Sequence, residues 1–419
     1  MEGEIIKFYR EKQNLTQAQL GEGICTTTHV SKIERGKTAY SEEMIMMFSD
    51  RLAIDIKQEV DKFKSLETLL QQWLEAIIMR RFKEMEDKKD EIERIPFIQS
   101  TYYADFYHLL KARHLIIQGE RTKALELLEY VNESYASLAE YEKNLLFHTY
   151  GVYYISDNAK VDNESNSMPI HYLKKVNMEQ YGNKEYYYHL AIAYHFIGSY
   201  IMAYFFAEKA LHFFKETNNY AQSINAESVM LLQMSRDTSV DFDELVNRYK
   251  NLIHNSEILG LNDKRSLLLN NLGFEYFNKG EYALSKQCYK QALQIDAPDS
   301  NSYLLHLCNY IDACLEEGIY SKTFLFKKIK EGFSLAKKLK STHFLIVLKL
   351  LKLKTENNTT AYFQFIEEKA LPYFTTTGHI IYRNRYGKVL LNRYIESNQY
   401  MEATKVFSEQ FLNKTPENM

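Results

Sequence analysis

Residues 269–297 read LNNLGFEYFNKGEYALSKQCYKQALQIDA, and this stretch decides the fold. Gly280 divides it into two segments whose apolar residues recur at helical spacing. Small residues stand where two antiparallel helices would cross, and large aromatic residues stand between them. These are the small residues Gly273, Ser285 and Ala292 and the aromatic residues Tyr276, Tyr282 and Tyr289. The arrangement is typical of a helix pair that repeats about every 34 residues.

The same spacing recurs along the chain. A second copy begins at Leu190 and contains Ala191, Tyr194, Gly198, Tyr200, Ala203, Ala207 and Ala210. Further copies lie near Ala112 and Leu391, and weaker ones near Phe147, Glu227 and Ile311. We expect the polar stretch 157–167 to form an exposed loop inside the copy near Phe147. This part of the chain resembles the tetratricopeptide-repeat family, which implies a right-handed superhelix with a concave binding face.

Composition favours an all-α protein. The 419 residues include 5 Pro and 15 Gly, well below the usual shares of about 5% and 7%. With 45% hydrophobic and 26% charged residues, the chain is neither a turn-rich β protein nor disordered. The net charge of -3 means that any binding of nucleic acid must come from a local basic patch.

Several functional classes are excluded by absent patterns. The four Cys residues are scattered and form no zinc-finger spacing, which indicates a reducing cytosol and no metal site. The charged start MEGEIIKFYREKQN is not a signal peptide, and no run of about 18 apolar residues occurs, so we expect a cytoplasmic protein that does not engage membranes. We find no catalytic triad pattern, phosphate-binding loop or dinucleotide fingerprint. We therefore expect no enzyme, no catalytic residue and no cofactor.

The N-terminal residues differ from the repeats. Residues 1–63 contain five short amphipathic segments, with Thr16, Thr26 and Ser41 at helix N-cap positions. Gln19 occupies the reciprocal position of a capping box with Thr16. The sequence predicts three regions: a small helical domain over 1–63, a charged linker helix over 64–96, and a repeat domain over 97–419.

The strings LTQAQL (15–20) and GICTTTHVSKIERG (23–36) resemble the lambda-repressor-like helix-turn-helix family. The resemblance covers roughly residues 4–63 and implies DNA binding through a recognition helix with an apolar inner face of Cys25, Val30 and Ile33. The predicted DNA-binding residues are Gln17, Thr27, Thr28, Ser31, Lys32, Arg35 and Lys37. We expect Glu34 to pair with a basic residue inside the domain rather than to touch DNA.

The residue types on the outer face suit this role. Hydroxyl groups can serve either base, and the Thr methyl group can contact the thymine methyl group. Gln17 stands at the start of the first motif helix, where a helix N-terminus favours phosphate. Residues 7–40 contain six Lys or Arg against three Glu, a net charge of +3 within an acidic molecule.

Asparagines mark the candidate ligand surface of the repeats. Asn271 and Asn309 fall at the same position of consecutive units, and Asn225 has the same phase. An Asn amide offers a donor and an acceptor together, so a ladder of amides can hold an extended peptide backbone. Asn270, Tyr276 and His195 lie near the same predicted surface, and Arg113 could pair with a peptide carboxylate. The alternative is that these Asn residues are polar positions on a solvated helix face.

A helix-turn-helix followed by such repeats resembles the peptide-pheromone-responsive regulators of Gram-positive bacteria, the RRNPP family, in its neutral-protease regulator branch. The resemblance implies a cytoplasmic quorum-sensing regulator of transcription. A short re-imported peptide would bind the repeats and change the oligomeric state of the protein, which would be a dimer or a tetramer. It would also change the binding of the protein to an operator in double-stranded DNA. The alternative that it implies is a Rap-like regulator that binds a response regulator of the sporulation phosphorelay. That activity would be sought in residues 65–95, around Gln71, Gln72, Trp73 and Glu84.

Overall fold

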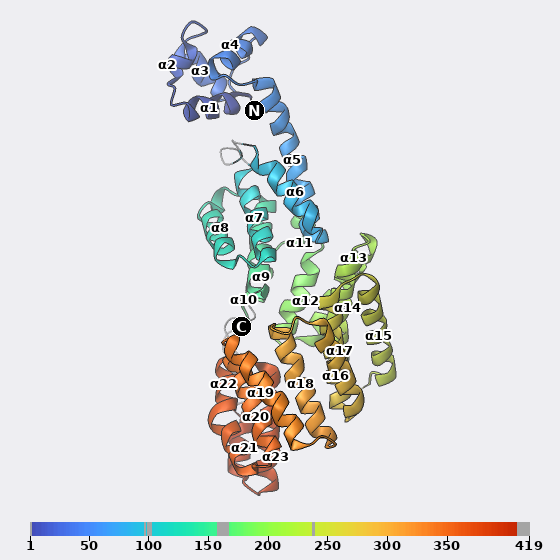
Figure 1. Ribbon diagram of the computed structural model, residues 1–419. Coiled ribbons are helices and arrows are strands. Elements are labelled where there is room, and N and C mark those ends of the chain that lie inside the picture. The colour runs from blue at the N-terminus through green and yellow to red at the C-terminus, as the bar shows by residue number, and fades with distance from the viewer. Residues whose placement is uncertain (1, 96–97, 99–102, 157–166, 237–238, 409–419) are drawn as a thin grey trace. The chain divides into compact units, whose positions relative to one another are not determined.

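The computed structural model describes residues 2–95, 98, 103–156, 167–236 and 239–408 (Figure 1). Within these ranges the chain forms helices and connecting turns and no strand, which confirms the all-α prediction. The chain divides into two compact units. Unit 1 comprises residues 1–156 and 172–183, and unit 2 comprises residues 157–171 and 184–419. The loop predicted over 157–167 lies outside the described residues except for its last position.

Unit 1 begins with a small helical bundle. It contains α1 (Glu2–Lys12), α2 (Gln17–Gly21), α3 (Thr27–Glu34), α4 (Glu42–Leu52) and the start of α5 (Ile56–Met79). The three predicted N-caps are confirmed, since Thr16, Thr26 and Ser41 each accept a hydrogen bond from a backbone N–H in the first turn of the helix that follows. The Thr16–Gln19 capping box is also complete.

Two glycines set how closely the bundle helices approach. A Cβ atom at Gly3 of α1 would lie 2.0 Å from the carbonyl oxygen of Ile33, and one at Gly21 of α2 would lie 2.9 Å from Val30 Cγ2. Any larger residue at Gly3 would therefore push α1 away from α3. The core beneath this contact includes Leu20, which has no exposed surface.

The region predicted as a single linker helix is different in the structure. The helix α5 starts at Ile56 and continues to Met79, and α6 (Phe82–Glu93) follows after a break. Arg80 adopts a left-handed conformation with φ of 55° and ends α5. The fifth short segment of the N-terminal region is thus the first part of a long helix, because no Gly or Pro interrupts residues 56–79.

The rest of unit 1 is built from α7 (Ala104–Gln118), α8 (Arg121–Glu133), α9 (Glu140–Ser156) and α11 (Met178–Tyr181), with α10 (Met168–Leu173) between α9 and α11. Gly119, at φ of 80°, turns the chain between α7 and α8. The indole of Trp73 in α5 donates a hydrogen bond to His114 Nδ1 in α7 over 3.3 Å. Because Trp73 has no exposed surface, α5 forms part of the core of unit 1.

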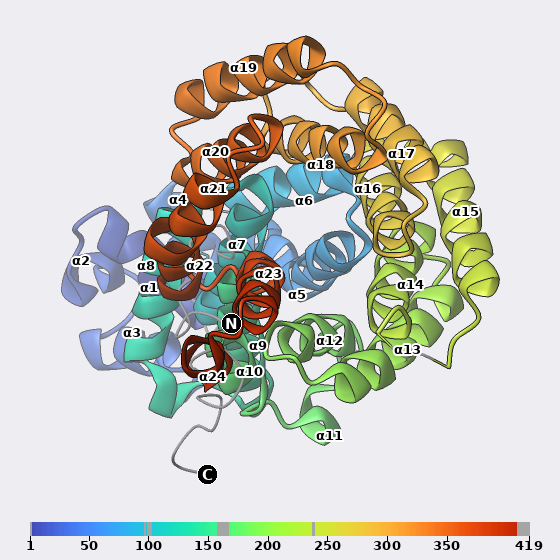
Figure 2. The same ribbon diagram turned by 90° about the horizontal axis from the view of Figure 1, so that it is seen from below.

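Unit 2 is a series of antiparallel helix pairs. Its helices are α12 (Tyr186–Phe196), α13 (Tyr200–Glu216), α14 (Tyr220–Met234), α15 (Phe242–Ile258), α16 (Asn262–Asn278), α17 (Tyr282–Ile295), α18 (Asn301–Glu317), α19 (Lys322–Lys338), α20 (Thr342–Thr355), α21 (Thr359–Phe365), α22 (Leu371–Thr376), α23 (Ile380–Glu396) and α24 (Tyr400–Phe407). In Figure 2, α14, α16 and α18 lie on the inner side of the curve and α15, α17 and α19 on the outer side. The first member of each pair therefore carries the inner surface of this unit.

The pair α16 and α17 has the packing that its sequence predicts. A Cβ atom at Gly273 would lie 2.8 Å from Tyr289 Cε1, so the absence of a side chain there makes room for the tyrosine ring. Ser285 donates a hydrogen bond to the Gly273 carbonyl oxygen over 2.8 Å. Ala292 has no exposed surface. Small residues thus lie at the helix crossing and a large one fills the space between the helices.

Two further features of the helices concern a local irregularity and the length of the apolar segments. Between α21 and α22 the chain forms a π-helical turn at Ile366–Ala370, so this pair is less regular than the others. Among the described residues, no helix is both long enough and apolar enough to span a membrane.

Candidate functional site

The recognition helix of the motif is α3, and its two faces differ in exposure. Val30 and Ile33 have no exposed surface, whereas Cys25, predicted to point inward, is half-buried in the turn before the helix. Apart from Gln17, the six residues predicted to contact DNA lie on α3 or directly after it. Thr27, Thr28, Lys32, Arg35 and Lys37 are exposed, and Ser31 is half-buried. Their placement agrees with a surface that can reach bases and phosphates, and the individual contacts stay predictions.

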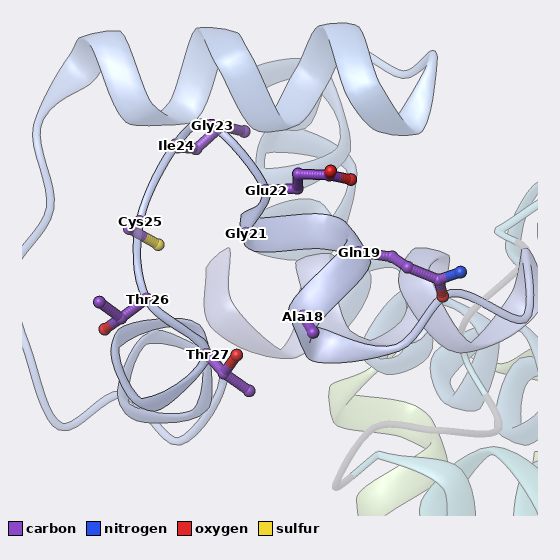
Figure 3. A pocket seen from close by; sticks show the side chains of 9 residues that line it. All are labelled: Ala18, Gln19, Gly21, Glu22, Gly23, Ile24, Cys25, Thr26 and Thr27. Carbon is purple, nitrogen blue, oxygen red and sulfur yellow. The ribbon is translucent and has the colours of Figure 1, made fainter.

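A pocket of about 850 Å³ lies at the turn between α2 and α3 (Figure 3). Its lining comes from the end of α2, the turn itself and the start of α3. The residues are Ala18, Gln19, Gly21, Glu22, Gly23, Ile24, Cys25, Thr26 and Thr27. Gly23, at φ of 70°, lets the chain reverse between the two helices without steric strain. The turn therefore brings the exposed N-terminus of α3 beside the end of α2.

A buried polar network fixes α3 against α1 and α2. Arg10 Nε of α1 donates to Glu34 Oε1 over 2.5 Å, and Gln17 Nε2 of α2 donates to Glu34 Oε2 over 2.7 Å. The hydrogen bond with Glu34 raises the pKa of Arg10, although burial acts in the opposite direction. The predicted pairing of Glu34 inside the domain is confirmed. Gln17 is half-buried, and within the described residues its second amide hydrogen makes no hydrogen bond, so its predicted phosphate contact stays a prediction.

Arg51 of α4 has a structural role in the helix-turn-helix that the sequence did not reveal. Its Nη1 donates to the carbonyl oxygens of Gln19, Leu20 and Glu22, at 2.9, 3.2 and 2.6 Å. These carbonyls end α2 and have no partner within the helix. Arg51 therefore holds the end of α2, and its distance in sequence from that helix leaves no local signal.

In unit 2, Asn270 and Asn271 of α16 and Asn309 of α18 form a surface that we call the asparagine face. Asn309 Nδ2 donates to Asn270 Oδ1 over 2.9 Å, and Asn270 Nδ2 donates to Asn271 Oδ1 over 3.4 Å. All three side chains are half-buried. The sequence predicted Asn271 as the counterpart of Asn309, but Asn270 is the residue that faces α18, because successive helical residues point about 100° apart.

The asparagine face keeps both a donor and an acceptor for a ligand. Within the described residues, Asn271 Nδ2 and Asn309 Oδ1 make no hydrogen bond. Two large apolar side chains of α16 are also exposed nearby in the helix, Leu267 at 45% and Phe274 at 38%. An amide pair flanked by exposed apolar side chains can hold a peptide backbone and accept apolar side chains.

The remaining predicted ligand residues are engaged elsewhere. Asn225 Nδ2 donates to Gln222 Oε1 on its own helix, α14. His195 of α12 lies against Gln233 of α14, with 3.0 Å between His195 Nδ1 and Gln233 Nε2. Burial lowers the pKa of His195 below its usual value. Both side chains are half-buried, and within the described part of the chain their hydrogen bonds are to Gln222 and Gln233 rather than to the asparagine face.

Two of the predicted ligand residues belong to the interior. Tyr276 is 7% exposed and packs in the core between α14 and α17, with its ring edge-on to Phe242. Arg113 of α7 is 1% exposed, and its Nη1 lies 3.4 Å from His148 Nδ1 in α9. Predicting a surface role for them was wrong, because the amphipathic side chains of Tyr and Arg give no indication of which way they point.

Comparison with known families finds two matches. A helix-turn-helix family model matches residues 6–57, and a tetratricopeptide-repeat model matches residues 267–299. The first range contains the whole α2–turn–α3 motif, and the second contains α17 and most of α16 with the asparagines of α16. The candidate DNA-binding surface thus lies within the first matched range, and the α16 part of the asparagine face lies within the second, whereas Asn309 of α18 follows it.

Comparison with individual proteins finds relatives along nearly the whole chain. The chain is 22% identical to the transcriptional activator NprA of Geobacillus stearothermophilus, over 94% of this chain and 98% of that protein. The apo form of the quorum sensor NprR from B. thuringiensis has a TM-score of 0.67 at 19% identity, covering 83% of this chain and 98% of that one. NprR in complex with its cognate peptide NprX has a TM-score of 0.61 at 20% identity, covering 79% and 99%. These structures share the fold of the present chain.

Proposed function

We propose that this chain is a member of the RRNPP family of peptide-responsive helix-turn-helix regulators, in the branch of the neutral-protease regulators, and that it is a cytoplasmic quorum-sensing regulator of transcription. The observation that carries this function is the full-length similarity to a transcriptional activator, together with an exposed recognition helix. The function needs no catalytic residue, since reading DNA and binding a peptide are both equilibrium events.

We propose that α3 enters the major groove of an operator. Thr27, Thr28 and Ser31 are placed to meet base edges, and Lys32, Arg35 and Lys37 to meet phosphates. The Arg10–Glu34 pair and the Arg51 contacts hold α2 and α3 in a fixed mutual orientation, which a base-specific contact requires. Gln17 would add a phosphate contact at the start of α2.

We propose that the asparagine face binds a short signalling peptide in extended conformation. The free donor on Asn271 and the free acceptor on Asn309 match the alternating polar groups of a peptide backbone. The exposed Leu267 and Phe274 suit apolar peptide side chains. A solved structure of the related NprR holds its cognate peptide NprX, which supports the same class of ligand here.

Peptide binding would control DNA binding through a change of state. Such coupling requires two arrangements of the chain that differ in peptide affinity, and it acts equally in both directions. In a dimer the two copies of α3 read half-sites about one helical turn of DNA apart, so a change in subunit assembly alters operator affinity. We propose that the chain forms a homodimer or a homotetramer and that peptide shifts its assembly.

A second candidate function is binding of a response regulator by α5 and α6. Gln71 and Gln72 of α5 are exposed, and Phe82 at the start of α6 is 63% exposed. These side chains offer a docking surface, whereas Trp73 is buried and cannot take part. A pull-down with phosphorylated response regulators tests this function, and loss of binding in a Gln71→Ala/Gln72→Ala variant would assign it to α5.

The main proposal is tested with the full-length chain and a synthetic library of random heptapeptides. We expect some library members to bind with micromolar or tighter affinity in calorimetry and to change the affinity for promoter-region DNA fragments. The variant Asn271→Ala/Asn309→Ala should bind these peptides at least about tenfold more weakly, because each lost hydrogen bond to a buried partner costs about 1–3 kcal/mol.

Asn251→Ala is the matched control, since Asn251 is exposed on α15 of the outer layer. Its peptide affinity should equal that of the wild type. The proposal fails if no heptapeptide binds, or if the peptides that bind leave DNA affinity unchanged.

A further inference from the structure

An ion-pair cluster continues the inner surface of α18 beyond the asparagine face. Asp312 follows Asn309 by three residues and Glu316 follows it by seven, so all three lie on one side of α18. The side chain of Asp312 is only 7% exposed. Two cations compensate its charge: Lys354 of α20, with 3.5 Å between Lys354 Nζ and Asp312 Oδ1, and Arg385 of α23, whose Nη2 donates to Asp312 Oδ2. Lys354 also pairs with Glu316.

Arg385 also reaches α16, the helix that carries Asn270 and Asn271. Its guanidinium carbon lies 5.2 Å from the ring centroid of Phe277, a cation–π contact. Phe277 follows Asn270 by seven residues, which corresponds to about 10 Å along the helix axis. Arg385 therefore contacts both helices that form the asparagine face, about two helical turns from Asn270 on α16 and about one turn from Asn309 on α18.

The guanidinium of Arg385 has hydrogen-bonding capacity to spare. It carries five N–H donors, and within the described residues only Nη2 makes a hydrogen bond, so Nε and Nη1 remain available. Its side chain is 31% exposed, which leaves it accessible. Although burial opposes protonation, the charge of Asp312 raises the pKa of Arg385, and the group stays cationic.

The charge of Asp312 is compensated by Lys354 and by only one edge of the Arg385 guanidinium. Burial acts to raise the pKa of Asp312, but Arg385 and Lys354 together hold that pKa below its usual value. Since Lys354 contacts both Asp312 and Glu316, the second edge of Arg385 can meet another carboxylate while Asp312 keeps its partners. A planar guanidinium is suited to such two-sided binding.

We propose that Arg385 reads a carboxylate of the bound peptide and thereby determines which peptides the protein accepts. This inference rests on the proposed binding of a peptide at the asparagine face. An extended chain advances about 3.3 Å per residue, so the carboxylate lies about three residues from the peptide segment that the amides hold. The ligand is thus a short peptide whose apolar part meets Leu267 and Phe274 and whose Asp, Glu or terminal carboxylate meets Arg385.

The test uses the full-length chain and the heptapeptides that it selects from the random library. Each selected peptide is made again with its carboxylates changed singly to amides, and both forms are titrated against the wild type and Arg385→Met. We expect amidation at one position to lower wild-type affinity by roughly 10- to 100-fold, the range for hydrogen bonds to a charged group. The same amidation should change the affinity of Arg385→Met by less than about twofold, since this variant has already lost the N–H groups that donate to the carboxylate.

Arg393→Met is the matched control, because Arg393 is exposed on the same helix and also lies over an aromatic ring, that of Phe363. It should keep the wild-type preference for the carboxylate. If Arg385→Met fails to fold, Arg385→Lys is the second variant, because it keeps the charge but loses the planar guanidinium with its paired N–H donors. Its preference for the carboxylate over the amide should fall by at least about fivefold.

The outcomes separate this inference from the proposed function. If no heptapeptide binds the wild type, both are overturned. If peptides bind through Asn271 and Asn309 but every amidation has the same effect on the wild type and on Arg385→Met, peptide binding stands and the role of Arg385 is overturned.

Discussion

Arg10 Nε and Glu34 Oε1 lie 2.5 Å apart, and their side chains are 10% and 3% exposed. This ion pair joins the first helix of the DNA-binding bundle to the last turn of its recognition helix. Gln17 completes the network by donating to the second oxygen of Glu34. The orientation of α3 thus depends on polar groups that are shielded from water, where the loss of one partner is costly.

The first prediction concerns the stability of the N-terminal bundle. Arg10→Met leaves the Glu34 carboxylate buried without its cation, and breaking a buried pair from one side typically costs about 3–5 kcal/mol. We expect the amide groups of α1 to α3 in full-length protein to lose hydrogen-exchange protection by that free energy. Lys7→Met, at an exposed position of the same helix, is the control and should keep its protection. A loss below about 1 kcal/mol in Arg10→Met would mean that packing alone holds α3.

The second prediction concerns the contribution of single charges to DNA binding. Lys32, Arg35 and Lys37 are exposed on and after α3. If each meets a phosphate, its change to Gln should reduce the slope of log affinity against log salt by about 0.9 on mixed-sequence duplex DNA. Lys64→Gln, at an exposed position of α5, should leave the slope unchanged. If all four variants kept the wild-type slope, α3 would not be part of the DNA interface.

The helix caps and the helix-pair packing could be predicted from sequence because their causes are local. Thr16, Thr26 and Ser41 act within one turn of their own helices, and the small residues of residues 269–297 recur at a fixed spacing. The sequence also predicted that Glu34 pairs inside the domain, but it did not identify the partner, Arg10, which lies 24 residues earlier.

What the sequence could not show depends on contacts between distant residues. Arg51 reaches carbonyls some 30 positions earlier, and Arg385 reaches Asp312 across 73 positions. Tyr276 and Arg113 have side chains that suit either a surface or an interior, so only the packing of neighbouring helices decided that both are buried. The sequence also could not show that Asn270 rather than Asn271 contacts Asn309 of α18, because adjacent residues of α16 face different neighbours.

The third prediction concerns the close contact of α16 with α17. Gly273→Ala would place a Cβ atom 2.8 Å from Tyr289 Cε1, which forces the two helices apart. Overpacking of this kind costs about 1–3 kcal/mol, so we expect a lower urea midpoint for the helical signal. Lys290→Ala, exposed on α17, is the control and should change the midpoint little. An unchanged midpoint for Gly273→Ala would show that the tyrosine ring moves aside without cost.

The fourth prediction concerns a pair of histidines near the C-terminus. His343 of α20 and His379, which precedes α23, have ring centroids 4.0 Å apart, and the ring of Phe374 lies 5.5 Å from His343. His343 Nδ1 is buried and has no hydrogen-bond partner among the residues that the structure describes. Burial, followed by the charge of His379, lowers the pKa of His343 to about 3. The aromatic surroundings therefore favour the neutral form in the folded protein.

This shift makes folding depend on pH in a defined direction. In the unfolded chain His343 titrates near its ordinary pKa of about 6.5, so the unfolded state binds more protons between pH 6.5 and about 3. The stabilisation is complete above pH 6.5 and is lost as the pH falls, by about 2–3 kcal/mol between pH 7 and pH 4.5. His343→Leu removes this contribution, so its free energy of unfolding in urea should fall less over that interval than that of the wild type. His254→Leu, at an exposed position of α15, should follow the wild type, and identical pH profiles for the wild type and His343→Leu would contradict the assignment.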